Sequence, residues 1–324
     1  MERPYRWGIL GAGNIANKFA SAVNYTEGSE VFAVASREAG KAKQFAEKYG
    51  ASRSYDNYQK LAEDPDVDVI YIATPHAFHH DQAILCLRNQ KPVLCEKPMA
   101  LSFKQVNSMI EVANANKTFL MEGMWSRFMP AINKALELVE GDVIGPVRYI
   151  RADFGFPAPY NLEGRLYNLK LGGGSLLDVG IYPLFLSTLF LGAPSTIRSL
   201  SKLAVTGVDE YCNIMFQYPG GEVASIFSSI TIKTSLTAEI AGTKGRLLFH
   251  PPFYKTNTLT FEINNGESNS FSFPHEHNGF EYEIRQVTDC LDKGLTECPI
   301  MPHSMSLQMA RVMDTVLEQC GIAY

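Results

Sequence analysis

A glycine-rich turn near the start of the chain constrains the fold more than any other stretch. Apolar residues 7–10 lead into this turn, and an apolar stripe follows it at helical spacing, at Ile15, Phe19 and Val23. Gly11 permits a tight turn, and Gly13, which has no Cβ, lets the backbone approach a phosphate closely. Ala16 would keep the new helix close to its strand.

The start of such a helix also binds anions, because its first N–H groups are unpaired and carry a partial positive charge. The turn therefore predicts a strand and helix that hold a dinucleotide pyrophosphate. The alternative is a glycine-rich turn in another kind of α/β domain. The predicted cofactor contacts here are Gly11, Ala12, Gly13, Asn14 and Ile15.

The composition indicates a globular protein. The chain has 324 residues, 46% hydrophobic and 19% charged, which is long enough for two domains. A net charge of −5 without a basic block favours neither nucleic acid nor a membrane surface as a partner. The six cysteines form no CxxC pair, and we expect reduced core residues of a cytoplasmic protein. No apolar signal segment follows Arg3 and Arg6, and the apolar residues 181–193, interrupted by Pro183, indicate a buried helix.

Strand-like and helix-like stretches alternate through the first part of the chain. Continuous apolar runs occur at 31–35, 69–73, 93–95 and 119–121, and helical spacing occurs at 42–49, 79–88 and 103–115. Continuous apolar strands suit a parallel sheet that is covered on both faces. The pattern predicts a doubly wound parallel sheet of the Rossmann type over residues 1–123.

From residue 124 onward the pattern changes to alternating strands with few helices between them. Examples are residues 147–151, 213–216 and 223–227, followed by helices near 280–291 and 304–319. This pattern favours an antiparallel sheet. The sequence therefore predicts an α/β protein whose second domain, residues 124–324, is an α+β domain built on a largely antiparallel open sheet.

The end of the second strand indicates which nucleotide is bound. An acidic residue there bonds the adenosine ribose and favours NAD, but this chain has Ser36-Arg37. A hydroxyl and a guanidinium suit a 2′-phosphate, so we predict NADP as the preferred cofactor, with NAD possible. Lys41 would add positive charge, whereas Glu38 opposes it. The alternative is that Arg37 is an ordinary surface residue.

Three further motifs, taken with the opening turn, identify a family resemblance. They are Ala73-Thr74-Pro75, Glu96-Lys97-Pro98 and the run from Asp178 to Tyr182. Together they resemble the glucose–fructose oxidoreductase/inositol dehydrogenase/MocA (Gfo/Idh/MocA) superfamily over essentially the whole chain. The chain looks most similar to the dimeric dihydrodiol dehydrogenases and glucose–fructose oxidoreductases, since many relatives have His at the position of Tyr182. Residues 123–130 are also similar to the dihydrodiol dehydrogenase version of the domain crossing.

The resemblance implies an NAD(P)-dependent oxidoreductase that pairs its second-domain sheets into a homodimer. It implies that Thr74, Pro75 and His79 border the nicotinamide ribose or the pyrophosphate, and that a cis peptide bond precedes Pro98. Glu96 would brace Lys97 or face the cofactor. The predicted cofactor-binding set beyond the opening turn is Ser36, Arg37, Lys41, Thr74, Pro75, His79, Glu96 and Lys97.

Oxidising a secondary alcohol with a nicotinamide requires a base that accepts the hydroxyl proton, and the reverse reaction requires an acid. Tyr182 would fill both roles, and the nearby ammonium of Lys97 would favour its phenolate. Lys97 lies at the carboxyl end of a predicted parallel strand, where such sheets bind ligands. Asp178, four residues before Tyr182, would orient the substrate or Lys97. The alternatives are a surface lysine, a buried core tyrosine and a helix-capping aspartate.

Aromatic residues gather in sequence between the signature motifs of the two domains. They are Trp125, Phe128, Phe154, Phe156, Tyr160 and Tyr167. Those that face the cleft would stack on a sugar ring or a cyclic diol, and Arg127 or Arg165 would add polar recognition. We predict a sugar, cyclic polyol or trans-dihydrodiol substrate bound by Trp125, Arg127, Phe154, Asp178 and Tyr182.

Other functional classes receive less support from the sequence. His275 and His277 form an HxH pair without further ligands at metal-binding spacing, so no metal is predicted. There is no GxSxG motif of a serine hydrolase. A glycosidase that keeps its nicotinamide bound and a non-catalytic nucleotide-sensing regulator remain alternatives on the same fold.

Overall fold

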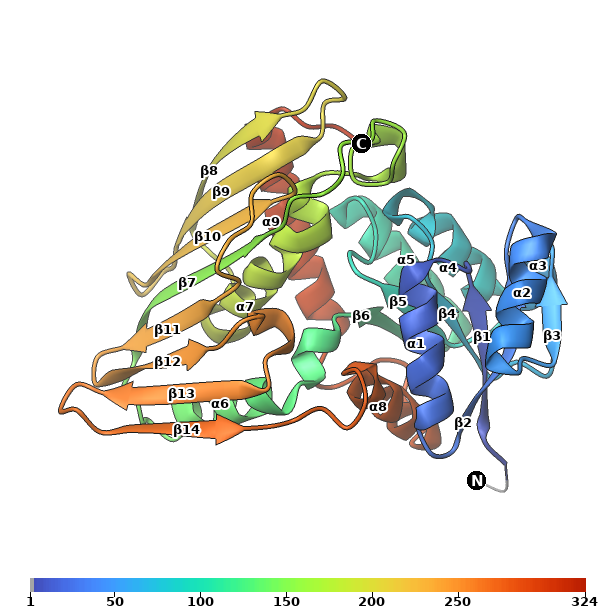
Figure 1. The fold of residues 1–324 in the computed structure, drawn as a ribbon, viewed down its shortest axis with the longest axis horizontal. Coiled ribbons are helices and arrows are strands. Elements are labelled where there is room, and N and C mark those ends of the chain that lie inside the picture. The colour runs from blue at the N-terminus through green and yellow to red at the C-terminus, as the bar shows by residue number, and fades with distance from the viewer. Residues whose placement is uncertain (1–2) are drawn as a thin grey trace. The chain divides into compact units, whose positions relative to one another are not determined.

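The structure, a computed structural model, describes residues 3–324 and divides into two compact units (Figure 1). Unit 1 comprises Met1–Trp125 and Glu276–Leu307, and unit 2 comprises Ser126–His275 and Gln308–Tyr324. The sequence predicted a single boundary after residue 123. The chain instead returns to unit 1 after the second domain has begun, and this return carries a complete helix.

Unit 1 is built on a six-stranded parallel sheet in the order β3-β2-β1-β4-β5-β6. Its strands are β1 Tyr5–Leu10, β2 Ser29–Ala35, β3 Arg53–Tyr55, β4 Val69–Ile72, β5 Val93–Glu96 and β6 Leu120–Gly123. Its helices are α1 Asn14–Tyr25, α2 Ala39–Tyr49, α3 Tyr58–Ala62, α4 His79–Arg88, α5 Phe103–Asn116 and α8 Phe280–Asp292. The predicted doubly wound sheet is confirmed.

Aromatic packing explains why α8 belongs to unit 1. Phe19, in the middle of α1, stacks on Tyr71 of β4 with ring centroids 3.6 Å apart. Phe280, the first residue of α8, meets the edge of Phe19 at 5.9 Å and stacks on Trp125 at 4.5 Å. Phe280 thus contacts two rings that lie 261 and 155 positions earlier in the chain, and local periodicity does not reveal this packing.

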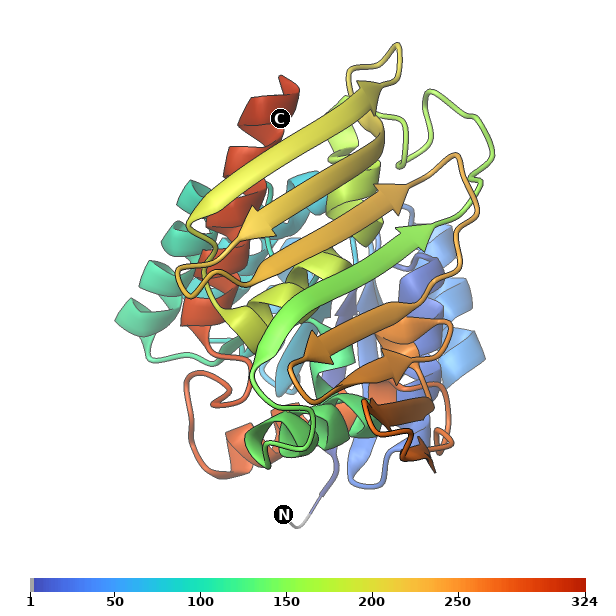
Figure 2. The ribbon, with the colours of Figure 1, turned by 90° about the vertical axis from the view of Figure 1, so that its left-hand side faces the viewer.

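Unit 2 is built on an eight-stranded sheet in the order β14-β13-β12-β11-β7-β10-β9-β8 (Figure 2). Its strands are β7 Val147–Gly155, β8 Thr196–Leu203, β9 Asp209–Gln217, β10 Val223–Ser229, β11 Ala238–Gly242, β12 Gly245–Phe249, β13 Thr258–Ile263 and β14 Ser268–Ser272. Only β7 and β10 pair in parallel among these neighbours, so the predicted largely antiparallel sheet is confirmed.

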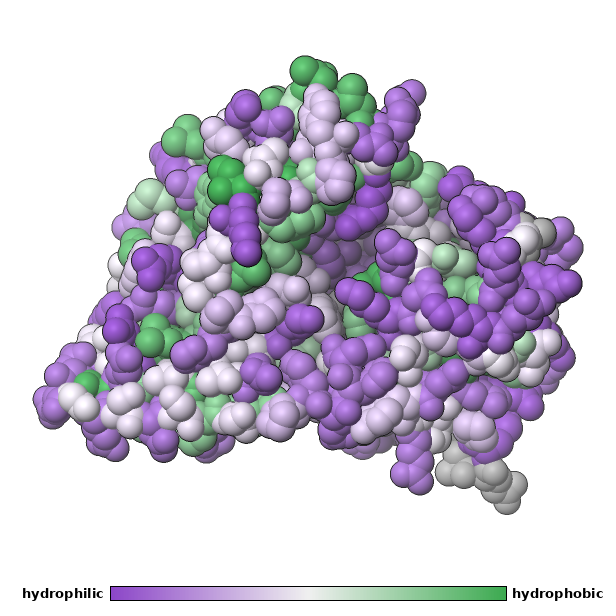
Figure 3. All heavy atoms as spheres, viewed as in Figure 1, coloured by the Kyte–Doolittle hydropathy of each residue, from purple (hydrophilic) through white to green (hydrophobic). Residues whose placement is uncertain are grey.

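Helices cover one face of this sheet and leave the other open (Figure 2). They are α6 Pro130–Glu140, α7 Ile181–Leu191 and the part of α9 His303–Cys320 that belongs to unit 2. The open face carries Leu200, 77% exposed, and Met215, 59% exposed. Figure 3 also shows hydrophobic side chains at the loop between β8 and β9, where Val205 is 83% exposed.

The apolar stretch before and within α7 lies inside unit 2. Within the part of the chain that the structure describes, Leu169–Leu191 is the one helical stretch long and apolar enough to cross a membrane, and 83% of its most apolar window is buried. The predicted buried helix is therefore confirmed for α7. All six cysteines are free, and only Cys320 is not buried.

Candidate active site

The glycine-rich turn between β1 and α1 has the predicted geometry. Gly11 has φ +102°, a conformation that side chains rarely adopt, and a Cβ there would lie 3.0 Å from Thr74 Cγ2 and 3.1 Å from the Ala73 carbonyl oxygen. Ala16 is fully buried on the inner side of α1, as expected. The protein itself therefore requires glycine at position 11.

Unlike Gly11, Gly13 has room for a side chain. Its surroundings therefore show whether a dinucleotide would fit this turn. It is exposed, has φ −88°, and a Cβ there would meet nothing closer than the Ala73 carbonyl oxygen at 3.9 Å. No side chain caps α1 at this residue, so the first N–H groups of the helix are open to a ligand. Neither the backbone nor the packing explains glycine here, whereas a closely approaching pyrophosphate would.

The residues after β2 differ in how far they are exposed to solvent. Ser36 is buried and its Oγ accepts a hydrogen bond from the Glu38 N–H at 3.2 Å. Arg37 is exposed, with its guanidinium carbon 5.2 Å from the centre of the Phe78 ring. Lys41 forms an exposed ion pair with Glu38 at 2.7 Å. Arg37 thus presents the predicted guanidinium at this strand end, while the charge of Lys41 is partly neutralised.

His79 joins the loops that follow β4 and β5. Its ring is fully buried, with Nδ1 2.8 Å from the Pro98 carbonyl oxygen and Nε2 2.8 Å from the Thr74 carbonyl oxygen. Burial lowers the pKa of His79, and the charge of Lys97 lowers it further. Thr74 also donates from Oγ1 to Gln82 Oε1 at 2.5 Å. Through these contacts, His79 positions the loop after β4 and the loop after β5.

Lys97 follows the carboxyl end of β5, and the predicted cis peptide bond to Pro98 is confirmed. Lys97 is partly exposed. Glu96, directly before it, is buried, accepts the Lys97 N–H at 3.2 Å through Oε2 and receives the hydroxyl of Tyr71 on Oε1. Glu96 therefore braces the backbone of Lys97, one of the two roles predicted for it.

Two buried carboxyl groups near this loop were missed from the sequence. Glu122, at the end of β6, accepts the Met99 N–H at 3.0 Å, and burial raises its pKa. Glu283 of α8 is fully buried, its pKa is raised by burial and by the charge of Glu96, and neither carboxyl oxygen has a hydrogen-bond partner among residues 3–324. The only signal for Glu283 was a carboxylate on the apolar side of a helix.

Asp178 and Tyr182 lie on consecutive helical segments of unit 2. Asp178 belongs to a short π-helix, Leu176–Gly180, a form often found at functional sites, and Tyr182 is the second residue of α7. Asp178 is buried and its Oδ1 accepts a hydrogen bond from the Arg165 guanidinium at 2.7 Å. Of the two arginines considered for substrate recognition, Arg165 thus lies beside a predicted catalytic residue.

An aromatic group surrounds the Tyr182 ring in unit 2. Phe154 lies 5.5 Å from Tyr182 and stacks on Tyr254 at 4.5 Å, and the ring centroids of Tyr254 and Tyr182 are 5.0 Å apart. Phe156 lies 6.3 Å from Phe154. Tyr254 was missed because it sits in a short turn between β12 and β13, far from the other members in sequence.

The other residues considered for the substrate wall make the following contacts. Arg127 is buried and donates to Asn133 Oδ1 of α6 at 2.8 Å, and Phe128 is buried. Tyr167 is buried against Val208 and Ile230, with Tyr160 at its edge, 4.9 Å away. Trp125 packs on Phe280 in unit 1. Tyr160 and Tyr167 thus pack together at a hydrophobic cluster of unit 2.

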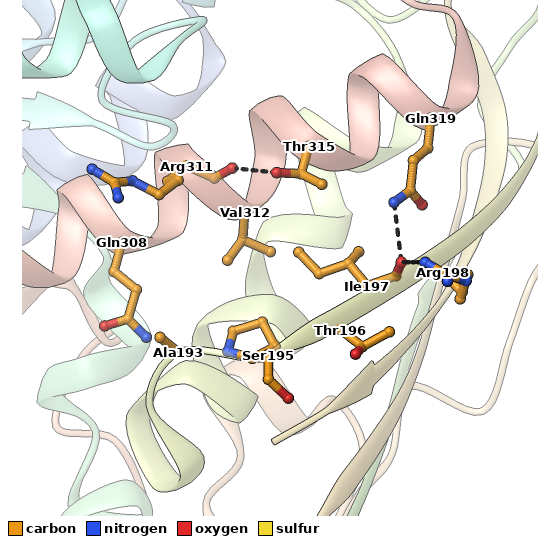
Figure 4. Close-up of a pocket in the computed structure, with 11 residues that line it drawn as sticks. Ala193, Ser195, Thr196, Ile197, Arg198, Gln308, Arg311, Val312, Thr315 and Gln319 are labelled. Carbon is orange, nitrogen blue, oxygen red and sulfur yellow. Dashed lines mark hydrogen bonds between the residues drawn. The ribbon is translucent and has the colours of Figure 1, made fainter. Parts of the chain in front are cut away.

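Within residues 3–324, no group of three or more His, Cys, Asp or Glu side chains could hold a metal ion. His275 bonds the Lys255 carbonyl oxygen through Nε2, and His277 bonds Ser21 Oγ through Nε2, each at 2.8 Å. A pocket of about 440 Å³ in unit 2, between the start of β8 and α9, is lined by residues such as Thr196, Arg198 and Val312 (Figure 4). None of the predicted site residues lines it.

Comparisons with known proteins find similar proteins that match nearly the whole chain. It is 38% identical to a trans-1,2-dihydrobenzene-1,2-diol dehydrogenase of Xenopus tropicalis, over 98% of this chain and 99% of the relative. The human enzyme of the same name is 34% identical, over 98% of each chain. Among solved structures, an aldose–aldose oxidoreductase from Caulobacter crescentus gives a TM-score of 0.89 at 26% identity, over 98% of each chain. A 3-ketoreductase from Actinomadura kijaniata, in complex with NADP and TDP-benzene, gives 0.87 at 27%, also over 98% of each chain.

Family assignments cover both predicted domains and confirm the resemblance. Residues 5–124 match the oxidoreductase family with an NAD-binding Rossmann fold, and residues 132–248 match the GFO/IDH/MocA C-terminal domain. This protein belongs to the Gfo/Idh/MocA family of oxidoreductases.

Proposed function

We propose that the protein is an NADP-preferring dehydrogenase or reductase that acts on a secondary alcohol or carbonyl of a sugar, cyclic polyol or trans-dihydrodiol. The observation that carries this proposal is the position of Lys97. It follows the carboxyl end of β5, in the same sheet as the glycine-rich turn, and its backbone is held by Glu96 while the next carbonyl is held by His79. Open α/β sheets bind ligands at this edge.

The residues that fit a dinucleotide are those of the turn and of the neighbouring strand ends. Gly13 and the start of α1 would face the pyrophosphate, Arg37 the 2′-phosphate, and Thr74 and Pro75 the ribose side. The bound dinucleotide would supply the hydride donor or acceptor. The neighbouring 3-ketoreductase and its variants were solved with NADP, which supports the preference proposed for Arg37.

Tyr182 would move the proton and Lys97 would assist it. An ammonium group beside a phenol favours the phenolate, and it can also hold the oxygen on which negative charge develops. Asp178 would orient the substrate, with the Arg165 ion pair fixing its carboxylate. Phe154 and Tyr254 flank the Tyr182 ring, and they would exclude water and stack on a ring-shaped substrate.

The names of the relatives support the substrate range. The curated relatives are dihydrodiol dehydrogenases and the solved neighbours include sugar oxidoreductases. We also propose the compartment and assembly predicted above, a cytoplasmic homodimer joined through the open sheet of unit 2. Its exposed Leu200 and Met215 are apolar side chains that a partner sheet would cover. Light scattering that finds a monomer at working concentration would exclude this assembly.

The test is a panel of sugars, cyclic polyols and trans-dihydrodiols, assayed for NADP reduction with the native protein and with Lys97→Ala. We expect turnover of at least one class by the native protein and its loss in the variant. Release of sugar from glycosides without net change in the coenzyme would favour the glycosidase. Tight coenzyme binding without turnover of any class would favour the regulator.

A further inference from the structure

Two cysteines of unit 2 that are far apart in sequence lie side by side. Cys212 is in β9 and Cys320 is the last residue of α9, and their sulfur atoms are 4.0 Å apart. This separation is the contact distance of two reduced thiols, and a disulfide needs the sulfurs to approach to about 2.0 Å. The two sulfur atoms would therefore have to approach by about 2 Å to form a covalent link.

The last turn of α9 is held against β8, which keeps the two thiols together. The Gln319 side chain donates from Nε2 to the Ile197 carbonyl oxygen at 3.0 Å (Figure 4). Its Oε1 accepts the Ser199 N–H at 3.0 Å. Cys320 follows directly, with Sγ 3.5 Å from Ser199 Oγ. Because β8 pairs with β9, this anchor also fixes Cys320 over Cys212.

The two thiols differ in exposure and in acidity. Cys212 is only 1% exposed, whereas Cys320 is partly exposed. The hydrogen bond from Cys212, and then those of Ser201 and Ser199, lower the pKa of Cys320 to about 6. The same bond to Cys320, together with burial, raises the pKa of Cys212. Cys320 is thus the thiol that a solvent-borne oxidant reaches, and Cys212 lies behind it.

The other four cysteines provide a contrast within the same chain. Cys86, Cys95, Cys290 and Cys298 are all fully buried. Burial raises the pKa of Cys86 to about 12 and that of Cys298 to about 11. Cys298 also lies near Cys290, so these two are a second thiol pair, but without an exposed member. Buried thiols of this kind are inert.

We propose that Cys212 and Cys320 are a peroxide-sensitive thiol pair that forms a reversible disulfide between β9 and the end of α9. The Cys320 thiolate attacks hydrogen peroxide, the O–O bond breaks, and a sulfenic acid and hydroxide form. The Cys212 sulfur then attacks the sulfenic sulfur, the S–O bond breaks and the S–S bond forms. The departing hydroxide takes the Cys212 proton and leaves as water, so the two thiols together supply the two electrons that reduce one peroxide.

The experiment treats the reduced native protein with hydrogen peroxide and maps its peptides by mass spectrometry. We expect one new cross-linked peptide containing Cys212 and Cys320, which dithiothreitol separates again, and no modification of the other four cysteines. The midpoint of thermal unfolding should rise on oxidation, because the link closes a loop between residues 108 positions apart. In Cys320→Ser, peroxide should leave both the masses of the cysteine-containing peptides and the midpoint unchanged.

Variants separate the two steps. In Cys212→Ser, dimedone should trap a sulfenic acid on Cys320, because no thiol remains to resolve it. Cys290→Ser is the matched control, and it should form the cross-link as the native protein does. The proposal is overturned if the native protein, mapped without any variant, loses the Cys320 thiol but keeps the Cys212 thiol. It is equally overturned if peroxide modifies neither thiol or links Cys290 to Cys298 instead.

Discussion

The Nδ1 atom of His79 lies 2.8 Å from the carbonyl oxygen of Pro98, the residue that follows Lys97. The opposite ring nitrogen faces the Thr74 carbonyl oxygen at the same distance, so one buried imidazole connects the ends of β4 and β5. A neutral imidazole has one N–H, and burial favours the neutral form here. A neutral His79 therefore donates to only one of these two carbonyls at a time.

We expect His79→Leu to lower the free energy of unfolding by roughly 1–3 kcal/mol, because it leaves a buried carbonyl without its donor. Turnover should also fall at temperatures where the variant remains folded, since the Lys97 loop loses its anchor. Urea unfolding and initial rates measure the two effects. The neighbouring His80, which is partly exposed, is the control, and His80→Leu should change stability by about 0.5 kcal/mol or less. Equal effects at both positions would contradict this role.

The two glycines of the first turn should respond differently to alanine. Gly11→Ala places a side chain at φ +102° against Thr74 and should destabilise the fold by about 1–3 kcal/mol. Gly13→Ala meets no protein atom within 3.9 Å and should leave the unfolding midpoint unchanged. Its Cβ would instead occupy the space of the pyrophosphate and weaken NADP binding by about tenfold or more, a loss of about 1.4 kcal/mol. Thermal melts of both variants measure the stability effects, and coenzyme titrations measure the affinity for NADP. Unchanged affinity in Gly13→Ala would exclude the proposed contact.

Arg37→Ala should reduce the preference for NADP over NAD. A hydrogen bond to a charged group contributes about 1.5–3 kcal/mol, so the ratio of the two dissociation constants should shift by roughly tenfold to a hundredfold. Lys41→Ala is the matched control, because the Lys41 ammonium already pairs with Glu38, and a smaller shift is expected. Titration of each variant with both coenzymes measures the ratio. A preference that Arg37→Ala leaves intact would assign the 2′-phosphate to another residue.

Asp209 predicts a pH dependence of stability. Burial raises the pKa of Asp209 to about 7, whereas an exposed aspartate titrates near pH 4. The folded protein therefore holds a proton that the unfolded chain releases between about pH 4 and pH 7. The contribution of this residue to the free energy of unfolding falls as the pH rises through that window. In Asp209→Asn this fall should be smaller.

Urea unfolding at several pH values between 4 and 8 measures the Asp209 effect. The exposed Asp142 provides the control, and Asp142→Asn should keep the native pH dependence. The Oδ2 atom of Asp209 accepts the Ser175 hydroxyl at 2.5 Å and the Leu176 N–H at 2.7 Å, at the start of the π-helix that carries Asp178. An unchanged slope in Asp209→Asn would mean that Asp209 is ionised in the folded protein at neutral pH.

Local conformational preferences and hydrophobic patterns in the sequence made much of the fold predictable. The turn at Gly11 follows from a conformation that glycine adopts at little cost, and the parallel strands follow from continuous apolar runs such as β2 and β4. The strand β14, in contrast, reads Ser-Asn-Ser-Phe-Ser, is mostly exposed and has no alternation that distinguishes it from a loop. Its strand form comes from pairing with β13, which is a tertiary effect.

Site residues could be proposed from the sequence where they lie in one local motif. Lys97 and Tyr182 each lie in a recognisable run of residues, whereas Tyr254 reaches the Tyr182 ring only through the folding of unit 2. The same limit applies to Cys212 and Cys320, which share no motif and meet through the β8 anchor of α9. His79 was placed correctly after β4, but its burial between two carbonyls could not be read from its neighbours in sequence.

The rate of hydride transfer in Tyr182→Phe, compared with that in Tyr254→Phe, tests the central claim most directly. The two rings lie 5.0 Å apart in the same aromatic group, so the variants remove the same hydroxyl from similar surroundings. With coenzyme saturating and a substrate found in the panel, Tyr182→Phe should lose about 10²–10⁴-fold in single-turnover rate, the usual contribution of a positioned acid or base, and Tyr254→Phe should stay near the native rate. Equal rates in the two variants would show that Tyr182 does not carry the proton, and the proposed mechanism would fail.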